Sequence, residues 1–326
     1  MPSHKSRMIG CLLGGAIGDA MGYPVEFMRY SDIARHFGGA GVRDLSNGDQ
    51  ISDDTQMSLF TAEGLLNSHR SGRSPVKSVY RSYLRWYYTQ CGVRMPGAKY
   101  EGGLLREAAI FASRAPGTTC LSSLSSGKMG TLANPINHSR GCGGVMRVAP
   151  CAVFPQAFDL GCRIAAITHG HPGGYISAGA LAELLQKLYY GQSLPDAVND
   201  LIIELDEIED ADSTRDALQH AVDLAAEGRP CAPSVRELGE GWVGEEALAI
   251  GVYCALSFPT DFAQSLRLAV NHDGDSDSTG SICGNIMGRL LGAGAGAIPV
   301  EWRDGVELCN VIRAYAVRLS TIPQEP

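Results

Sequence analysis

The sequence Asn271-His272-Asp273-Gly274-Asp275-Ser276-Asp277-Ser278-Thr279-Gly280 places carboxylates at alternate positions directly before an apolar run. Small and apolar side chains recur at helical spacing over residues 281–291, so we expect the acids at the N-terminus of a helix. Hard oxygen donors at this spacing suit Mg²⁺, Mn²⁺ or Ca²⁺ better than zinc. Acidic residues are also favoured in the first turn of any helix, so capping alone is the alternative.

A second acidic cluster, Ser52-Asp53-Asp54-Thr55, opens another run with helical spacing at residues 56–66. Its first residue is suited to cap a helix, so capping is the simplest alternative here too. Two adjacent aspartates without a nearby cation repel each other, which makes a purely structural cap less economical. Two clusters that each combine a hydroxyl with two carboxylates favour one shared two-metal site, provided that the fold brings them together.

The composition is that of a globular protein, because 44% of the 326 residues are hydrophobic and 19% are charged. A chain of this length can bury a sizeable core. Glycine is abundant, with 40 residues, many of them beside the acidic motifs where the backbone turns or approaches a ligand. The formal net charge of −8 argues against general nucleic-acid binding, since a phosphate backbone attracts basic surfaces.

Ten scattered cysteines include no Cys-x-x-Cys pair and no zinc-type spacing with histidine. We therefore expect a reducing, cytoplasmic setting. An apolar run after Lys5 and Arg7 superficially resembles a signal peptide, but it stops at Asp19 and no clear small-x-small cleavage site follows. No run reaches the roughly 18 apolar residues that span a bilayer, so we expect a soluble protein.

Helical periodicity covers most of the chain, whereas the strict alternation typical of strands is hard to find. Ser74-Pro75 combines an N-cap with a proline in the first turn, and Gly191 ends another apolar stripe. The predicted helices cover residues 8–21, 75–88, 172–190, 195–208, 213–226, 243–257, 261–271, 278–293 and 303–319, besides the run that follows Ser52. The acidic segment 204–210 is expected to be a solvated helix end and loop. We predict one all-α domain over residues 1–326.

Two loops between the acidic clusters contain unusual residue types. In the segment 134–150, three glycines in the four positions 141–144 could expose amides at a helix N-terminus, where phosphate oxygens bind, although a structural turn is the alternative. The second loop is Thr168-His169-Gly170-His171-Pro172-Gly173-Gly174-Tyr175. Its paired histidines could bind a metal, but hydrogen bonding or helix capping is the more common use of such a pair.

Taken together, these motifs resemble the ADP-ribosylglycohydrolase family. Five motifs in the same order carry the resemblance: Gly14-Gly15-Ala16-Ile17-Gly18-Asp19-Ala20-Met21-Gly22 with Pro24-Val25-Glu26-Phe27, Ser52-Asp53-Asp54-Thr55, Gly143-Gly144-Val145-Met146-Arg147, Thr168-His169-Gly170-His171-Pro172 and Gly274-Asp275-Ser276-Asp277-Ser278. The resemblance spans about residues 8–302. It implies a compact, single-domain multi-helix fold with a central cleft that holds two Mg²⁺ ions, or Mn²⁺ in their place. The implied reaction is hydrolysis of the glycosidic bond between ADP-ribose and a protein side chain.

The resemblance also implies roles for individual residues. The implied metal ligands are Ser52, Asp53, Asp54, Asp275, Asp277 and Ser278. The implied contacts to the diphosphate or ribose of the substrate are Ser139, Gly141, Gly143, Gly144, Met146 and His169. Glu26 matches a glutamate near the cleft mouth of some relatives. We assign catalysis to Glu26, Asp53 and Asp277, with a carboxylate that takes a proton from the attacking water.

The acceptor to which ADP-ribose is attached is less closely defined. Some arginine-directed relatives carry an extra aspartate in a loop that corresponds here to residues 91–101, and this segment contains no aspartate, only Glu101. Arginine-linked ADP-ribose is therefore favoured only weakly over serine-linked or non-protein substrates. A regulatory or target protein is a possible partner, and ADP-ribose is the expected product.

Two other classes of protein compete with this interpretation. The segment Asp275-Ser276-Asp277-Ser278-Thr279 fits the Asp-x-Asp-x-Thr pattern of haloacid-dehalogenase phosphatases, but that motif should follow a buried strand near the start of a domain. A protein that binds ADP-ribose or a partner without turnover is the other alternative. All six proposed ligands are oxygen donors, which favours the enzyme.

Overall fold

The computed structural model describes residues 2–45 and 50–323, and this part of the chain is helical. It forms fifteen α-helices and five short 3-10 helices, and its one β-type pairing is an antiparallel bridge between Gly141 and Val243. The α-helices are α1 (His4–Gly22), α2 (Tyr30–Phe37), α3 (Asp53–Ser71), α4 (Pro75–Cys91), α5 (Thr118–Ser125), α6 (Ala157–Ala165), α7 (Pro172–Tyr189), α8 (Leu194–Asp206), α9 (Asp212–Ala226), α10 (Ala232–Glu237), α11 (Gly244–Ser257), α12 (Phe262–Val270), α13 (Ser276–Leu291), α14 (Val300–Gly305) and α15 (Cys309–Leu319). The 3-10 helices are η1 (Tyr23–Val25), η2 (Gly103–Arg106), η3 (Ala108–Phe111), η4 (Cys142–Gly144) and η5 (Ala149–Val153). The predicted all-α fold is confirmed.

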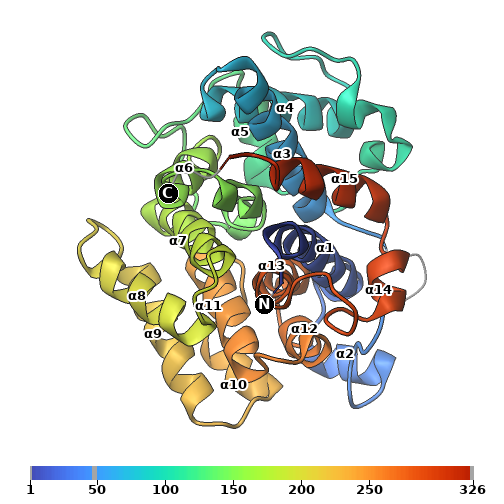
Figure 1. Cartoon of the computed structure of the whole chain (residues 1–326), viewed down its shortest axis with the longest axis vertical. Helices are drawn as coiled ribbons and strands as arrows, with labels where there is room; N and C mark the ends of the chain where they lie inside the picture. The colour runs from blue at the N-terminus through green and yellow to red at the C-terminus, as the bar shows by residue number, and fades with distance from the viewer. Residues whose placement is uncertain (1, 46–49, 324–326) are drawn as a thin grey trace.

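Helices α1 and α13, from opposite ends of the chain, lie side by side at the centre of the molecule (Figure 1). Glycines on both helices allow this close contact. A Cβ atom on Gly14 would lie 2.1 Å from the Gly284 carbonyl oxygen, and one on Gly284 would lie 1.9 Å from that of Gly14. Gly18 faces Gly280 in the same way. Residue numbers rise along one helix as they fall along the other, so the two helices run antiparallel.

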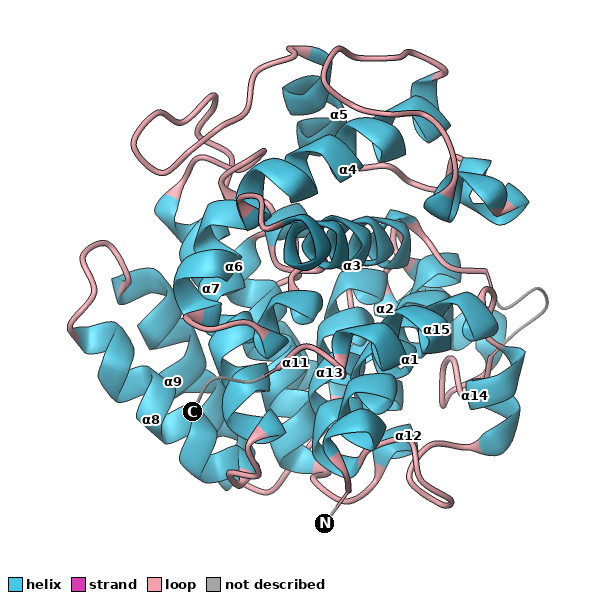
Figure 2. Cartoon of the chain, turned by 45° about the horizontal axis from the view of Figure 1, so that its top comes forward, coloured by secondary structure: helices cyan, strands magenta, loops and turns pink. Residues whose placement is uncertain are grey.

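This antiparallel packing positions the candidate site. Gly22 at the end of α1 lies against the backbone of Ser276, the first residue of α13. The turn that follows α1 therefore meets the acidic start of α13. Helix α3 crosses above this pair, between it and the layer that contains α4 and α5 (Figure 2).

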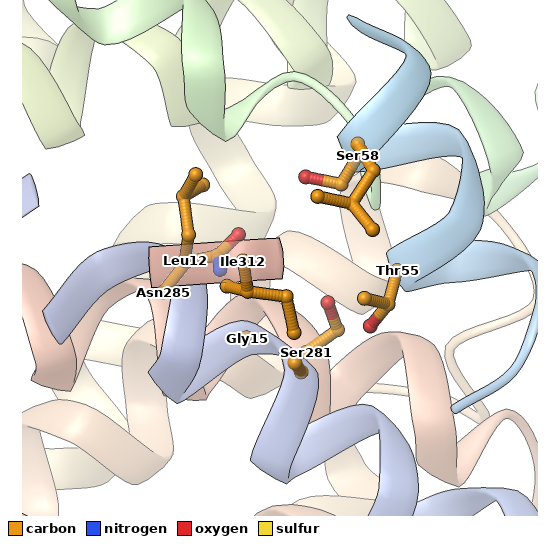
Figure 3. Close-up of a pocket in the computed structure, with 9 residues that line it drawn as sticks. Leu12, Gly15, Thr55, Ser58, Ser281, Asn285 and Ile312 are labelled. Atoms are coloured by element: carbon orange, nitrogen blue, oxygen red, sulfur yellow. The ribbon is translucent and has the colours of Figure 1, made fainter. Parts of the chain in front are cut away.

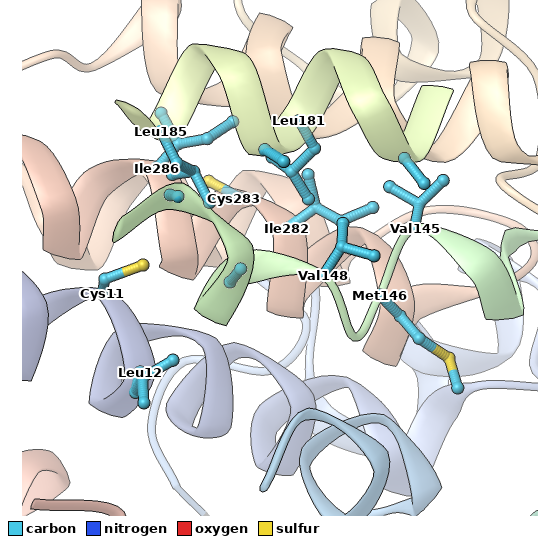
Figure 4. Packing of buried hydrophobic residues seen from close by; sticks show 14 of the residues in the cluster. Cys11, Leu12, Val145, Met146, Val148, Leu181, Leu185, Ile282, Cys283 and Ile286 are labelled. Atoms are coloured by element: carbon cyan, nitrogen blue, oxygen red, sulfur yellow. The ribbon is translucent and has the colours of Figure 1, made fainter. Parts of the chain in front are cut away.

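The core beneath this junction is apolar and continuous. Leu181 and Leu185 of α7 lie beside Ile282 and Ile286 of α13 (Figure 4), and all four side chains are fully buried. Burial of a branched aliphatic side chain contributes roughly 1.5–3 kcal/mol, so this packing holds α13 rigidly. A rigid α13 fixes the position of the acids at its first turn.

The main error in the predicted helices concerns residues 303–319. The prediction was one helix, but α14 ends at Gly305 and α15 begins at Cys309. The chain is extended at Val306 (ψ 138°), and Leu308 adopts a left-handed conformation (φ 59°), which breaks the helix. The short helices α2, α5, α6 and α10, each of at most nine residues, were not predicted.

Two other expectations about chain segments can be compared with the structure. The acidic segment 204–210 does end a helix, and most of its residues are exposed. The segment His4–Val25 is long and apolar enough to cross a membrane by length and composition, but 83% of its apolar window is buried inside the fold. Its contacts with α13 account for that apolar character.

Candidate metal centre

The two acidic clusters meet in the folded chain, which is the condition for a shared metal site. They line one cavity of about 280 Å³, to which the turn after α1, the start of α3 and the start of α13 all contribute. The acids of this wall are Glu26, Asp53, Asp54, Asp275 and Asp277, and Ser278 lies beside them. All six residues are buried, so their carboxylates face the cavity and one another more than bulk water.

Three of these acids form the tightest group. Glu26, Asp275 and Asp277 each offer one carboxylate oxygen, and the three oxygens lie within 4.8 Å of one another. None of these acids takes part in an ion pair within residues 2–45 and 50–323. Buried carboxylates normally pair with a cation, so this group is suited to hold one.

Two buried oxygen atoms support the same conclusion. Glu26 Oε2 and Asp54 Oδ2 have no hydrogen-bond partner in the described structure, and both residues line the cavity. An unsatisfied buried carboxylate oxygen costs about 1–3 kcal/mol or more. Carboxylate oxygens without partners are the ligands that hard divalent cations prefer, so the donor set fits a hard metal ion.

The pKa values of these acids reflect their crowding. Burial, and then repulsion from Asp275 and other carboxylates, raises the pKa of Glu26 to about 8. Burial is also the largest cause that raises the pKa of Asp53 to about 8 and the pKa values of Asp54 and Asp277 well above the usual range. A bound cation reverses this effect, because it favours the ionised carboxylates.

Helix capping explains part of both clusters, as the alternative interpretation proposed. The Ser52 hydroxyl accepts a hydrogen bond from the Asp54 amide (3.2 Å) at the start of α3. The Asp275 carboxylate caps α13 by accepting from the Ser278 amide at 3.3 Å. Capping uses Asp275 only in part, however, and it leaves Asp54 Oδ2 unpaired. The acids therefore exceed what the two caps require.

Asp19 of α1 is a residue to which the sequence analysis gave no role. It is fully buried, and its carboxylate accepts hydrogen bonds from the Ser52 amide (2.9 Å) and from the Thr55 amide (3.1 Å). Burial raises its pKa to about 6 despite these bonds. A single acid inside an otherwise apolar helix was the signal that could have identified it. Asp19 fixes the start of α3 and adds negative charge behind the metal-facing acids.

The predicted substrate-binding residues are only partly on the cavity wall. Gly141, Gly143, Met146 and His169 line it, whereas Ser139 and Gly144 do not. Ser139 instead organises the loop: its hydroxyl contacts Thr119 Oγ1 at 3.2 Å and accepts from the Gly141 amide. Gly144 is buried within η4. The α-helix expected after these glycines is instead a pair of 3-10 helices, η4 and η5.

The two histidines of the second loop have different positions. His169 is buried, its Nδ1 contacts the Thr168 hydroxyl at 2.8 Å, and burial followed by the charge of Arg147 lowers its pKa to about 3. His169 is therefore neutral and presents its ring to the cavity. His171 caps α7 by accepting from the Gly173 amide at 3.0 Å.

Several wall residues come from segments with no distinctive sequence pattern. The segment 115–119, which ends in the first turn of α5, lines the cavity, and the Gly117 amide donates to Asp53 Oδ2 at 3.0 Å. Phe27 and Trp242 stack at the wall with ring centroids 5.7 Å apart, and Phe27 is 75% exposed. A second cavity, lined by Thr55, Ser281 and Asn285 among others (Figure 3), has a volume of about 10 Å³. That space suffices for one water molecule at most.

The fold and the cavity together define an all-helical protein with a buried acidic site. A family model described as ADP-ribosylglycohydrolase matches residues 1–326. The chain therefore belongs to the ADP-ribosylglycohydrolase family, as the five motifs indicated.

The chain is also similar to individual proteins of known sequence or structure. The chain is 26% identical to the ADP-ribosyl-[dinitrogen reductase] glycohydrolase of Rhodospirillum rubrum, over 94% of this chain and 92% of that one. It is 27% identical to an uncharacterized protein of Archaeoglobus fulgidus, over 97% and 96% of the two chains. A solved structure titled ADP-ribosylglycohydrolase-related protein complex has a TM-score of 0.63 and 25% identity, with 98% of this chain and 99% of that chain covered.

Proposed function

We propose that this protein hydrolyses the glycosidic bond between ADP-ribose and an acceptor side chain, in the acid-lined cavity and with divalent cations. The observation that carries the proposal is the group of buried, unpaired carboxylates formed by Glu26, Asp275 and Asp277 in a chain of the ADP-ribosylglycohydrolase family. Arginine-linked ADP-ribose is the first substrate to test. Serine-linked and non-protein conjugates are the next.

The residues suited to hold the cations are those that face the cavity. Glu26, Asp275 and Asp277 form one group of donors, and Asp53, Asp54 and Ser278 lie close enough to the same wall to extend it to two ions. Ser52 is less suited, because its hydroxyl caps α3 and it does not line the cavity. Bound Mg²⁺ or Mn²⁺ would supply positive charge for the ribose hydroxyls and would lower the pKa of water.

Glu26 is the best candidate for the general base. It lies on the cavity wall, and its Oε2 accepts no hydrogen bond within residues 2–45 and 50–323, so this atom is free to accept a proton. It would take the proton of the attacking water as the bond between the anomeric carbon and the acceptor atom breaks. The proton is then available for the leaving group. With cations bound, Asp53 and Asp277 would be ionised, and their negative charge would stabilise an oxocarbenium-like transition state.

The part of the wall formed by the segment 141–146 and His169 is suited to the rest of the substrate. Gly141 and Gly143 carry no side chain, so a ligand can approach their backbone closely. His169 is neutral and can hydrogen-bond a hydroxyl or phosphate oxygen without repelling the acids. The Gly117 amide orients Asp53. The wall as a whole supports binding of a polar, extended molecule such as ADP-ribose.

Where the protein acts, and with which partners, is also part of the proposal. All ten cysteines carry free thiols, which supports a reducing compartment such as the cytoplasm. The proposed partner is an ADP-ribosylated protein, and the proposed product is ADP-ribose.

The experiment is release of ADP-ribose from an arginine-ADP-ribosylated protein, with Mg²⁺, with EDTA and with Asp277→Ala. Release that depends on Mg²⁺ and is lost in the variant supports the proposal. If only a serine-linked substrate is cleaved, the acceptor changes and the reaction class stands. Absence of turnover on both, with ADP-ribose still bound, would replace the enzyme by a binding protein.

A further inference from the structure

Sulfur atoms line one side of the acidic cavity, next to the start of α13. The Cys142 thiol, in η4, donates to Asp275 Oδ2 at a distance of 2.7 Å. The Ser278 hydroxyl lies 3.7 Å from Cys142 Sγ and 3.9 Å from Met146 Sδ. A carboxylate, a hydroxyl, a thiol and a thioether therefore converge on one part of the wall.

This combination is unusual for a site that serves hard cations only. Mg²⁺ and Ca²⁺ prefer oxygen donors, whereas thiolate and thioether sulfur select softer metals. A cysteine that only filled space would face apolar side chains, as Cys254 does in α11. Cys142 instead faces the acids, and its thiol contacts a carboxylate that caps α13.

A second observation indicates independently that this cavity takes a cation. The buried atoms Glu26 Oε2 and Asp54 Oδ2 have no partner in the described structure, and both residues line the cavity with Cys142. The sulfur atoms therefore lie on the same wall as carboxylate oxygens that a cation would neutralise. An ion bound next to Asp275 lies within reach of the thiol.

We propose that Cys142 and Asp275 bind a thiophilic divalent cation such as Zn²⁺ or Cd²⁺, with Ser278 and Met146 beside it. The inference rests on the proposed function only in placing cations in this cavity. Binding converts the thiol to a thiolate and releases its proton to solvent. Because hard and soft ions would share Asp275, they compete, and a thiophilic ion would inhibit the Mg²⁺-dependent reaction.

Cys120 is the matched control. Its thiol also lines the cavity, but its Sγ lies 3.1 Å from a guanidinium nitrogen of Arg147. That positive charge repels a cation, whereas the Cys142 thiol contacts the carboxylate of Asp275. The two thiols share a cavity and differ in the charge beside them.

The experiment is a titration of the full-length protein with Cd²⁺, followed by the ultraviolet charge-transfer absorption of Cd²⁺–thiolate bonds and by calorimetry. The wild-type protein and Cys120→Ser should give a saturable band at one Cd²⁺ per chain. Cys142→Ser should lose that band, and its Cd²⁺ affinity should fall by at least about tenfold. Asp275→Asn should weaken the band as well, and excess Mg²⁺ should compete with Cd²⁺ in the wild-type protein.

Circular dichroism and thermal melting establish that each variant is folded before it is titrated. A band of unchanged strength and affinity in Cys142→Ser, or its loss in Cys120→Ser alone, overturns the inference. The result of the Cd²⁺ titration can be distinguished from the result of the test for ADP-ribose release. Mg²⁺-dependent release of ADP-ribose with no Cd²⁺ band refutes only this inference, and a Cys142-dependent band in a protein without turnover refutes only the hydrolase.

Discussion

Helix α3 carries acidic residues in two places with opposite surroundings. Near its middle, Glu63 is buried and pairs with Arg85 of α4, with the Arg85 Nε–Glu63 Oε2 distance at 2.9 Å. Glu63 also accepts from the Leu104 amide and the Ser82 hydroxyl, and Arg85 donates to carbonyl oxygens of the loop 99–102. At the start of the same helix, Asp53 and Asp54 face other carboxylates.

The difference separates a structural acid from a functional one. The pair around Glu63 is complete, so its role is to fasten α4 and the following loop to α3. Within residues 2–45 and 50–323, neither acid at the start of α3 forms an ion pair, and Asp54 Oδ2 has no hydrogen-bond partner. Burial of like charges is costly, and it is retained where a ligand supplies the missing charge. Incomplete pairing of carboxylates that line one cavity, more than acidity or burial alone, identifies the site.

The largest expected effect is on folding, at the complete pair. Glu63→Ala leaves the Arg85 guanidinium buried without its carboxylate and should lower the free energy of unfolding by about 3–5 kcal/mol. Urea denaturation of the metal-free protein measures this. The exposed substitution Glu301→Ala is the control and should change stability by less than about 0.5 kcal/mol. If Glu63→Ala lowers the free energy of unfolding by less than about 1 kcal/mol, Glu63 does not have the structural role assigned to it.

The next effect is on the reaction, at the incomplete cluster. Asp277→Asn keeps the size of the side chain and removes its charge, so kcat/KM for release of ADP-ribose should fall by at least about 100-fold. The stability of the metal-free protein should not decrease, because repulsion from Asp54 and Asp275 is relieved. Asp212→Asn, at the exposed start of α9, is the control for a lost aspartate. Full activity in Asp277→Asn would exclude this acid from the site.

A smaller effect should appear as a pH dependence of the metal-free protein. The pKa values of Glu26 and Asp53 are about 8 in the folded chain and lie near 4 when unfolded. The folded state therefore holds more protons between these values, and its stability decreases as pH rises from about 5 to 8.

Thermal melting in EDTA should show this as a decrease of several degrees in Tm across that range. Saturating Mn²⁺ should remove most of the decrease, since metal binding requires the ionised acids. A Tm in EDTA that rises steadily from pH 5 to pH 8 would contradict the crowding of these carboxylates.

The smallest effects distinguish the two serines of the clusters. Ser278 lines the cavity, so Ser278→Ala should weaken Mn²⁺ binding by about tenfold. Ser52 caps α3, so Ser52→Ala should cost about 1 kcal/mol of stability with little change in metal affinity. Calorimetry and urea denaturation on both variants test the pair. The reverse pattern would make Ser52 the ligand and Ser278 the cap.

Much of this site could be predicted from sequence because the acids are close together in the chain. Asp53 with Asp54, and Asp275 with Asp277, are short motifs at helix starts, and the all-α fold follows from apolar periodicity. The glycines on α1 and α13 recur every four residues and could have predicted that these helices touch. Such a contact would also have placed Glu26 beside α13.

Other residues depend on tertiary contacts that no local pattern encodes. Asp19 of α1 accepts a hydrogen bond from the Ser52 amide at the start of α3, and the Gly117 amide, from a distant loop, donates to Asp53. Trp242 meets Phe27 only because α11 begins beside the turn after α1. The break at Leu308 requires a left-handed conformation that leucine rarely adopts, so no residue pattern predicted it.

The most direct test of the central claim is Mn²⁺ binding by calorimetry, on variants from both acidic places of α3. The wild-type protein should bind Mn²⁺ at one or two ions per chain with release of protons, and Asp54→Asn should weaken that binding by at least about tenfold. Glu63→Gln, studied at a temperature where it is folded, should bind Mn²⁺ as the wild-type protein does. Equal binding by the wild-type protein and Asp54→Asn, or no binding by either, would contradict the assignment of the unpaired acids as a metal centre.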